Sequence, residues 1–262
     1  MIVGIVGLIV WTYSQKQIPS TIQLDRTEPT KVLPVKEIKL ALVADIHNDW
    51  GEFDKAMVKI KDNNNQILLV VGDMTIYGKN SELIEAKKEL DGSGINYAVV
   101  PGNHDAYRRL GGKYIYDGIF DKRYQVIRIE NLKLILIDNS GYEGLGLAQW
   151  SWVETEVAEC RKVLCLAVMH RPLNHNFSTH LMGENNIKVT AEASKLLKLL
   201  VENGVRQIEA GHLHYASSYE LDGIRTDIVG AISRERNTQS PRYTELVIKG
   251  NEIERRVVEV GE

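Results

Sequence analysis

The 262-residue chain contains few of the residues that mark specialised protein classes. Its 2 Cys are too few for a disulfide framework or a cysteine-rich zinc site. With 6 Pro, 21 Gly and no repeated segment, collagen-like and solenoid architectures are excluded. It also lacks the series of long apolar runs that a multi-span membrane protein needs. What remains is an average globular composition, 44% apolar and 26% charged, which is enough to bury a sizeable core.

The charge is balanced as well. Lys and Arg number 32 against 35 Asp and Glu, which gives a formal net charge of −3. Such a balance indicates neither a broad basic face nor an acidic tail, so we do not expect nucleic acid as a partner.

The first 13 residues are almost all apolar and end in Trp11 and Tyr13. As a helix they would span about 20 Å, less than the ~30 Å of a hydrocarbon core, and the two aromatics suit a membrane interface. No basic residue precedes the run, which argues against a cleaved signal peptide. We expect a membrane anchor here, with a buried N-terminal strand as the alternative.

Residues 14–36 are polar, lack periodicity and include three prolines, a pattern typical of a flexible linker. We therefore expect one folded domain over residues 37–262. We also expect that domain to lie outside the cytoplasm, although the mixed charges of the linker leave the cytoplasmic side open.

Short runs rich in Val, Ile and Leu alternate with helical patterns after the linker. This alternation predicts an α/β layered fold with strands buried on both faces. Towards the C-terminus, Asp222-Gly223 and Gly250-Asn251 each separate two strand-like runs and predict hairpins. The expected strands outside the hairpins are 39–44, 67–71, 97–101, 132–137, 163–169 and 207–210. The expected helices include one around Asp54 in which Phe53, Met57 and Ile60 share a face, two over residues 81–90 and 149–161, and one that Thr190 caps and Gly204 ends.

Polar side chains of metal-ligand type follow most of these runs. The carboxyl ends of strands converge on one crevice in open α/β sheets, so these side chains can meet. Gly72, Gly102 and Gly211 let the backbone turn sharply as it leaves each strand. The motifs are Asp45-Ile46-His47, Gly72-Asp73, Gly102-Asn103-His104-Asp105, His170 and Gly211-His212-Leu213-His214.

The donors in these motifs define a metal type. Imidazole, carboxylate and amide groups without a thiolate suit Mn, Fe, Zn, Co or Ni better than Ca. The carboxylate of Asp73 has two oxygens and is able to bridge two ions, a usual arrangement for attack on phosphorus. Because 5 of the 7 His fall in these motifs, each after an apolar run, we regard coincidence as a poor explanation.

Taken together and in this order, the motifs resemble the signature of the calcineurin-like metallophosphoesterases, from about residue 39 to residue 215. The resemblance implies a four-layer α/β/β/α sandwich of two mixed sheets flanked by helices. It implies two divalent or trivalent metal ions at the strand ends, and a metal-bridging hydroxide that attacks a phosphomonoester or a phosphodiester.

The same resemblance assigns roles to individual residues. His104 would face the substrate and protonate the leaving oxygen, with Asp105 orienting its ring. Asp73 would bridge the two metals. One metal would be held by Asp45, His47 and His214, and the other by Asn103, His170 and His212.

Residues 134–138, 149–157 and 170–172 are similar to the branch that contains class III cyclic-nucleotide phosphodiesterases and purple acid phosphatases. The sequence departs from the family pattern at one point. In the second motif, Gly-Asp is often followed by another acidic residue, and residues 74–78 contain none. The ligand Asp73 is retained, so the departure bears only on the subgroup.

Other residues have two readings each. Arg171 either pairs with a substrate phosphate or lies on a surface loop. His175 and His180 either line the substrate mouth or are ordinary loop residues, and residues 107–120 either wall the substrate or pack on the sheet. We expect Cys165 to be a small core residue without a disulfide to Cys160.

These observations predict a metal-dependent phosphohydrolase acting on a small phosphoester. Two alternatives are a catalytically inactive scaffold of the same fold and a nuclease, which would need a basic groove. The choice between monoester and diester, the identity of the metals and the oligomeric state are left open by the sequence.

Overall fold

The computed structural model describes residues 36–106 and 114–261 of the chain. Every expected strand and helix has a counterpart in it, and a further strand forms at residues 125–129. In chain order the elements are β1 (Glu37–Val43), α1 (Trp50–Asp62), β2 (Ile67–Val71), α2 (Asn80–Gly92), β3 (Asn96–Val100), the short 3₁₀ turn η1 (Tyr116–Gly118), β4 (Gln125–Ile129), β5 (Leu132–Ile137), α3 (Gly146–Val157), β6 (Leu164–Met169), α4 (Ile187–Glu202), β7 (Gln207–Ala210), β8 (Ser217–Leu221), β9 (Ile224–Ile228), β10 (Arg242–Lys249) and β11 (Glu252–Glu259).

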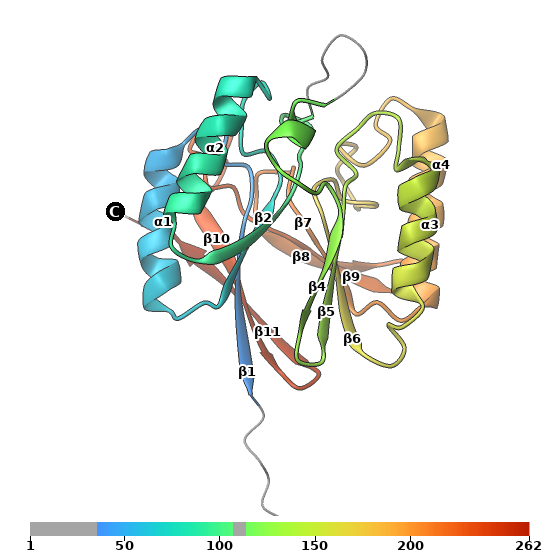
Figure 1. Cartoon of the computed structure of the whole chain (residues 1–262). Helices are drawn as coiled ribbons and strands as arrows, with labels where there is room; N and C mark the ends of the chain where they lie inside the picture. Colours follow the sequence, from blue (N-terminus) through green and yellow to red (C-terminus); the bar gives the residue numbers. More distant parts are fainter. Residues whose placement is uncertain (1–35, 107–113, 262) are drawn as a thin grey trace, which may run out of the picture. The chain divides into compact units, whose positions relative to one another are not determined.

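Two mixed sheets pack face to face, with helices on both outer sides (Figure 1). The five-stranded sheet has the order β11-β10-β1-β2-β3, and the six-stranded sheet has the order β4-β5-β6-β7-β9-β8. Helices α1 and α2 cover the first sheet, while α3 and α4 cover the second (Figure 1). The expected α/β/β/α sandwich is therefore confirmed.

The strands that carry the motifs run parallel within each sheet. β1 pairs in parallel with β2, and β2 with β3, while β6 pairs in parallel with β5 and β7. Parallel strands need crossover connections, here helices that bury both faces of the sheet, which explains why these runs are apolar throughout. Their carboxyl ends consequently open towards the same edge of the sandwich.

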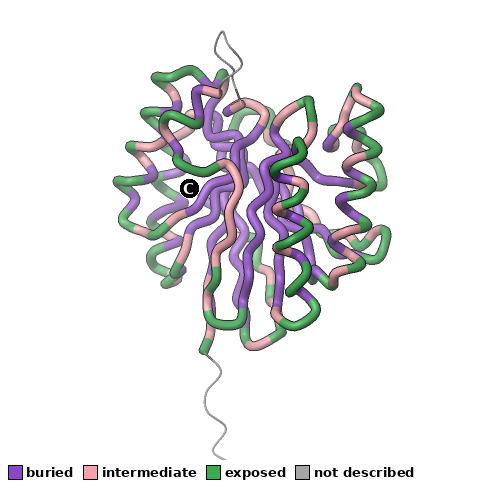
Figure 2. The backbone as a smooth tube through the Cα atoms, turned by 45° about the vertical axis from the view of Figure 1, so that its right-hand side comes forward, coloured by how far each residue is buried: buried purple, intermediate pink, exposed green. Residues whose placement is uncertain are grey.

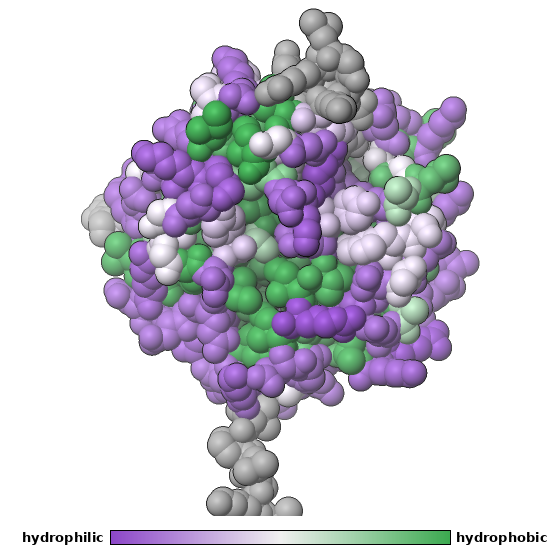
Figure 3. Space-filling view, in the orientation of Figure 1, coloured by the Kyte–Doolittle hydropathy of each residue, from purple (hydrophilic) through white to green (hydrophobic). Residues whose placement is uncertain are grey.

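Three apolar clusters hold the layers together, and Figure 2 shows the buried strands in the middle with exposed residues on the outer helical faces. One cluster lies between the two sheets, and the others lie beneath each pair of helices. The surface of the helical layers is mostly hydrophilic in the view of Figure 3, and apolar side chains reach the surface between those layers.

Both C-terminal hairpins form as expected. β8 and β9 pair in antiparallel register around Asp222-Gly223, and β10 and β11 pair around Gly250-Asn251. Asp222, Gly223 and Gly250 all have positive φ, the conformation that such tight turns require.

Two local expectations were wrong. The helix that Thr190 was expected to cap begins one turn earlier, because the side chain of Asn186 accepts hydrogen bonds from the backbone N–H groups of Lys188 and Val189. Cys160 and Cys165 form a disulfide instead of remaining free. Cys160 follows α3 and Cys165 lies in β6, so the turn between them brings the two sulfurs together.

The expected anchor, residues 1–13, lies outside the described residues, as does the expected linker up to residue 35. Arg108 and Arg109 of the expected substrate wall lie outside them too. Within the described ranges, no helix combines the length and apolar character needed to cross a membrane.

Candidate metal centre

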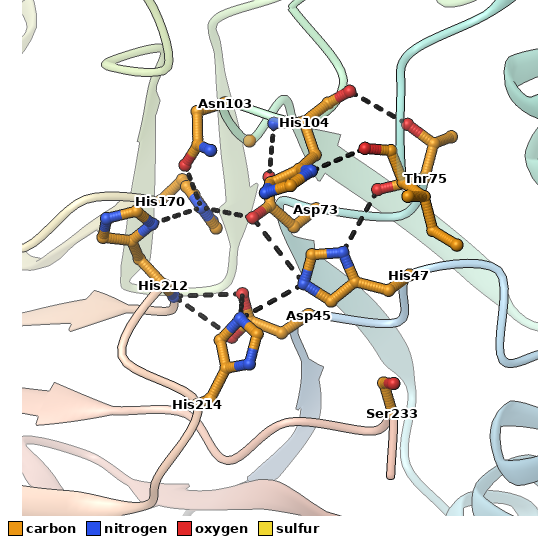
Figure 4. Close-up of polar contacts among 12 residues, drawn as sticks. Asp45, His47, Asp73, Thr75, Asn103, His104, His170, His212, His214 and Ser233 are labelled. Carbon is orange, nitrogen blue, oxygen red and sulfur yellow. Dashed lines mark hydrogen bonds and ion pairs between the residues drawn. The ribbon is translucent and has the colours of Figure 1, made fainter. Parts of the chain in front are cut away.

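Loops that follow five strands bring the motif side chains together at one edge of the sandwich (Figure 4). The first sheet contributes the residues after β1, β2 and β3, and the second contributes those after β6 and β7. In the close-up, Asp73 lies at the centre of the group, between residues of both sheets (Figure 4). The two sheets therefore build one site.

A first group of donors surrounds one side of Asp73. The ligand atoms of Asp45, His47, Asp73 and His214 all lie within 4.8 Å of one another. His47 Nε2 is 3.1 Å from His214 Nε2, and His214 Nε2 is 3.5 Å from Asp45 Oδ1. This group, called the first cluster below, corresponds to one expected ligand set.

A second group lies on the other side of the same carboxylate. His170 Nε2 is 3.1 Å from Asp73 Oδ2 and 3.2 Å from His212 Nδ1. The amide oxygen of Asn103 is also 3.2 Å from His170 Nε2. Asp73, His170 and His212, with Asn103 beside them, form the second cluster.

Backbone carbonyls orient two of the imidazoles. His170 Nδ1 is 2.8 Å from the carbonyl oxygen of Val71, and His47 Nδ1 is 3.2 Å from that of Thr75. A carbonyl only accepts, so each Nδ1 carries a proton and each Nε2 is the nitrogen that faces the cluster. This is the outer hydrogen bond that metal-ligating histidines typically make.

The donor spacing fits bound metal ions. Two ligands about 2.0–2.1 Å from one ion lie about 3 Å apart when their bonds to it are roughly perpendicular or tetrahedral. The imidazole pairs at 3.1 and 3.2 Å match that spacing. The nitrogen and oxygen donors also match the preferences of first-row transition metals, so the residues present fit a pair of ions that share Asp73.

Burial shifts the pKa values of several groups in the two clusters. Burial lowers the pKa of His47 to about 4, and burial together with the charges of His170 and Arg171 lowers that of His212 to about 2. Both rings are thus neutral at physiological pH, the form that binds metals. Burial raises the pKa of Asp45 well above its usual value.

Asp73 and His170 form a charge pair in the metal-free protein. Burial would raise the pKa of Asp73, but the charge and hydrogen bond of His170, together with the charges of His104 and His47, outweigh it and lower that pKa below its usual range. Burial likewise opposes the charge on His170, yet Asp73 raises the pKa of that ring to about 9. The carboxylate therefore attracts a cation to the place where a metal would bind.

The backbone is strained at the ligands. Asp45, His47, Asp73, His212 and His214 all have φ between 47° and 72°, a region that residues other than glycine seldom occupy. Such conformations cost about 1–3 kcal/mol each and concentrate at functional sites.

Two glycines permit the close approach of these loops. A Cβ at Gly102 would collide with the carboxylate and the backbone of Asp73, and one at Gly72 would collide with the ring of His170. Both positions therefore exclude any larger residue.

Asp105 has a different role from the expected one. Its carboxylate accepts hydrogen bonds from the backbone N–H groups of Met74, Thr75 and Gly102 and from the Thr75 hydroxyl, at 2.8–3.2 Å. The ring of His104 is instead oriented by the carbonyl oxygen of Ile76, 2.6 Å from its Nδ1. Asp105 therefore joins the loops after β2 and β3, and the expectation that it orients the His104 ring was wrong.

We expect Asp105→Asn to lower stability by about 2–3 kcal/mol, because an amide has one acceptor oxygen to offer several inward-pointing donors. Activity should fall less than on loss of a ligand, since every donor to the metals is retained. Urea unfolding combined with metal analysis tests this. Normal stability with abolished turnover would instead assign Asp105 to the chemistry.

Two hollows flank the site. One of about 400 Å³ is lined by His47, Ile76, Tyr77, His104, Glu235 and Arg236. The other, of about 320 Å³, is lined by Asn103, Ala106, Tyr114, Ser140, Gly141, Tyr142 and Glu143. Arg236 could not be identified from the sequence, because its loop follows no motif and comes to line the same hollow as His104 only through the fold.

The structure also shows the surroundings of the residues for which the sequence left two interpretations open. Arg171 is buried, so it is not a surface residue, whereas His180 is exposed and pairs with Glu184 at 2.9 Å. His175 is half-buried and 3.0 Å from the Tyr215 hydroxyl. Within the expected wall, Tyr114 lines the second hollow, and Tyr116 stacks on Phe120 with ring centroids 4.8 Å apart.

Comparisons with known proteins agree with this geometry. The family model described as calcineurin-like phosphoesterase matches residues 38–216, which include every residue of both clusters. No curated protein sequence matches the chain.

Solved structures resemble the fold at low sequence identity. A dimetal phosphatase from Danio rerio has a TM-score of 0.61 at 16% identity, over 87% of this chain and 100% of that one. A purple acid phosphatase from yellow lupin has a TM-score of 0.65 at 12% identity, over 87% of this chain and 52% of that one. GAP50, the anchor in the inner membrane complex of Plasmodium, has a TM-score of 0.64 at 13% identity, over 86% of this chain and 85% of that one. At such identities the likeness concerns the fold.

Proposed function

Because the chain belongs to the calcineurin-like phosphoesterase family, we propose that it is a metal-dependent hydrolase of a small phosphomonoester or phosphodiester. One observation supports this most directly. A single buried carboxylate, that of Asp73, belongs to both donor clusters. A shared carboxylate is the feature that a two-metal site requires and that a single-metal or purely structural site does not.

The two clusters provide separate ligand sets for two ions. Asp45, His47 and His214 would hold one, and Asn103, His170 and His212 would hold the other, with Asp73 between them. When bound, a pair of Mn, Fe, Zn, Co or Ni ions supplies Lewis-acid stabilisation and lowers the pKa of water for in-line displacement at phosphorus. The Val71 and Thr75 carbonyls orient two of the imidazoles so that their Nε2 atoms would be available to the ions.

His104 is suited to protonate the leaving oxygen. Its Nδ1 donates to the carbonyl of Ile76, which leaves Nε2 as the nitrogen that exchanges a proton with the substrate. The same ring lines the larger hollow together with Tyr77 and Arg236. We therefore assign the leaving group to that hollow, beside His104.

We expect His104→Gln to lower kcat by about 100-fold on alkyl phosphate esters, because an alkoxide leaves poorly without a proton. The loss should be smaller on p-nitrophenyl esters, whose leaving group needs little protonation. Steady-state kinetics on both ester types, with metal content measured in parallel, tests the role. Equal losses on both types would show that His104 is not the acid.

A substrate panel tests the proposed function as a whole. The metal-free protein is loaded separately with Mn, Fe, Zn, Co or Ni and assayed on monoesters, cyclic and linear diesters, and DNA, with Asp73→Asn as the blank. Turnover by the wild type alone supports the proposal. Two metal equivalents without turnover would favour a scaffold, and hydrolysis restricted to DNA would favour a nuclease.

We also propose that residues 1–13 attach the domain to a membrane and that the domain lies outside the cytoplasm. The Cys160–Cys165 disulfide supports an oxidising compartment, where such bonds persist. Removing residues 1–34 should transfer the protein from the membrane fraction to the soluble fraction. Recovery of the full chain in the soluble fraction would contradict the proposal.

A further inference from the structure

Arg171 is a buried cation without a counter-charge in the described part of the chain. The residue is 4% exposed, no carboxylate in that part of the chain pairs with its side chain, and its Nε has no hydrogen-bond partner there. Lys133, which is 1% exposed, makes a useful contrast, because it pairs with Glu156 at 2.8 Å and Glu159 at 3.1 Å. Basic side chains are seldom buried unless they are paired, since an uncompensated charge there is costly.

The position of Arg171 is fixed by its backbone. Its N–H donates to the side-chain oxygen of Asn139 at 2.9 Å, and the Asn139 amide donates to the Arg171 carbonyl at 2.6 Å. Asn139 is itself buried, next to the end of β5. The residue is thus clamped at a defined place directly after the ligand His170.

The guanidinium lies beside the smaller hollow and the second cluster. It is 5.2 Å from the ring centroid of Tyr142, which lines that hollow together with Asn103. Arg171 also directly follows His170, a member of the second cluster. Arg171 does not itself line the hollow, but its neighbour Tyr142 does, so a group held next to Asn103 lies close to Arg171 and to the second cluster.

The unpaired charge of Arg171 indicates the chemistry of that group. Among the described residues Arg171 has no carboxylate partner, and the second cluster beside it contains only one carboxylate, that of Asp73. An anionic group of a ligand would supply the counter-charge that the guanidinium lacks. We propose that Arg171 binds a negatively charged phosphoryl oxygen of the substrate and so favours dianionic phosphomonoesters over monoanionic phosphodiesters.

This assignment rests on the proposed function and makes it more specific. A monoester loses its second proton near pH 6, so above that pH it carries one more negative charge than a diester. The planar guanidinium is able to donate two parallel hydrogen bonds to such a phosphoryl group. A diester has fewer charged oxygens for the metals and Arg171 to share.

Calorimetric titration of the metal-loaded protein with inorganic phosphate at pH 8 tests the contact directly. We expect Arg171→Gln to weaken phosphate binding by about 10–100-fold, the usual effect of losing a charge-assisted hydrogen bond, and Arg171→Lys to be intermediate. Arg206→Gln, an exposed arginine after α4, is the matched control and should bind as the wild type does. Unchanged phosphate affinity in Arg171→Gln would overturn the proposal.

Kinetics test the preference between ester classes. In Arg171→Gln, kcat/KM for p-nitrophenyl phosphate should fall about 10-fold more than that for bis(p-nitrophenyl) phosphate, with metal content unchanged. An equal loss on both esters would contradict the discrimination.

Stability separates a binding role from a structural one. Because the cation is unpaired, Arg171→Met should keep or raise the denaturant midpoint of the metal-free protein while it weakens phosphate binding. A lower midpoint with unchanged phosphate affinity would make Arg171 structural. The calorimetry needs no turnover, so a wild type that hydrolyses no ester would end the proposed function without deciding the role of Arg171.

Discussion

Asp73→Asn should lower kcat/KM by about 1000-fold or more on any phosphoester that the wild type hydrolyses. One oxygen of Asp73 accepts the backbone N–H of His104 at 2.8 Å, and the other lies 3.1 Å from His170 Nε2 and 3.9 Å from His47 Nε2. The second oxygen thus stands between histidines of both clusters. An amide there replaces a charged acceptor with an NH₂ group, which does not ligate metals.

Loss of metal should accompany this loss of activity. Since both clusters share the carboxylate, Asp73→Asn should retain fewer than two equivalents of metal after dialysis. A substitution of a residue that belongs to one cluster alone should weaken the binding of chiefly one ion. Mass spectrometric metal analysis and steady-state kinetics measure both effects. Asp54→Asn, on the exposed side of α1, is the matched control. Full metal content and turnover in Asp73→Asn would end the two-metal interpretation.

The sequence was most informative about the site because its ligands follow the ends of apolar strands. His47, Asp73 and His170 each lie one to four residues beyond a strand whose apolar run was readable without a structure. The parallel arrangement of those strands then brings the side chains together. The roles assigned to individual residues remain predictions, although the two clusters group them as expected.

Features that depend on contacts between loops could not be predicted from the sequence. The hydrogen bonds of Asp105 join residues about 30 positions apart, and no local pattern distinguishes them from a bond to the adjacent His104. The unpaired burial of Arg171 depends on Asn139 and Tyr142, which are equally remote along the chain. Even the nearby Cys160–Cys165 pair was misjudged, because its closure depends on how α3 turns into β6.

A second buried acidic site lies between the two sheets. Glu209 on β7 and Asp227 on β9 are register partners, and both are fully buried. Arg225 and Arg255 approach Asp227 at 2.9 and 3.7 Å, whereas Glu209 is hydrogen-bonded to Gln207 and one of its oxygens has no partner among the described residues. Burial and the charge of Asp227 raise the pKa of Glu209 to about 8.

This raised pKa makes stability depend on pH with a definite sign. The unfolded carboxyl titrates near 4.3, so between that pH and about 8 the folded state binds more protons than the unfolded state. Stability should therefore fall as the pH rises through this window, with a limiting slope of about 1.4 kcal/mol per pH unit and a total loss of several kcal/mol. Glu209→Gln removes the titration, so the variant should be more stable than the wild type at pH 8.

The comparison between variants isolates Glu209 from the histidines of the metal site. His47 and His212 have lowered pKa values, so in the metal-free protein they contribute the opposite trend, a loss of stability as the pH falls below about 6.5. That trend is common to the wild type and Glu209→Gln and cancels in their difference. Urea unfolding from pH 5 to pH 8.5 measures this difference, and Glu220→Gln, on exposed β8, is the control that should follow the wild type. If Glu209→Gln keeps the slope of the wild type, the carboxyl is ionised throughout and must have a partner in solution that compensates its charge.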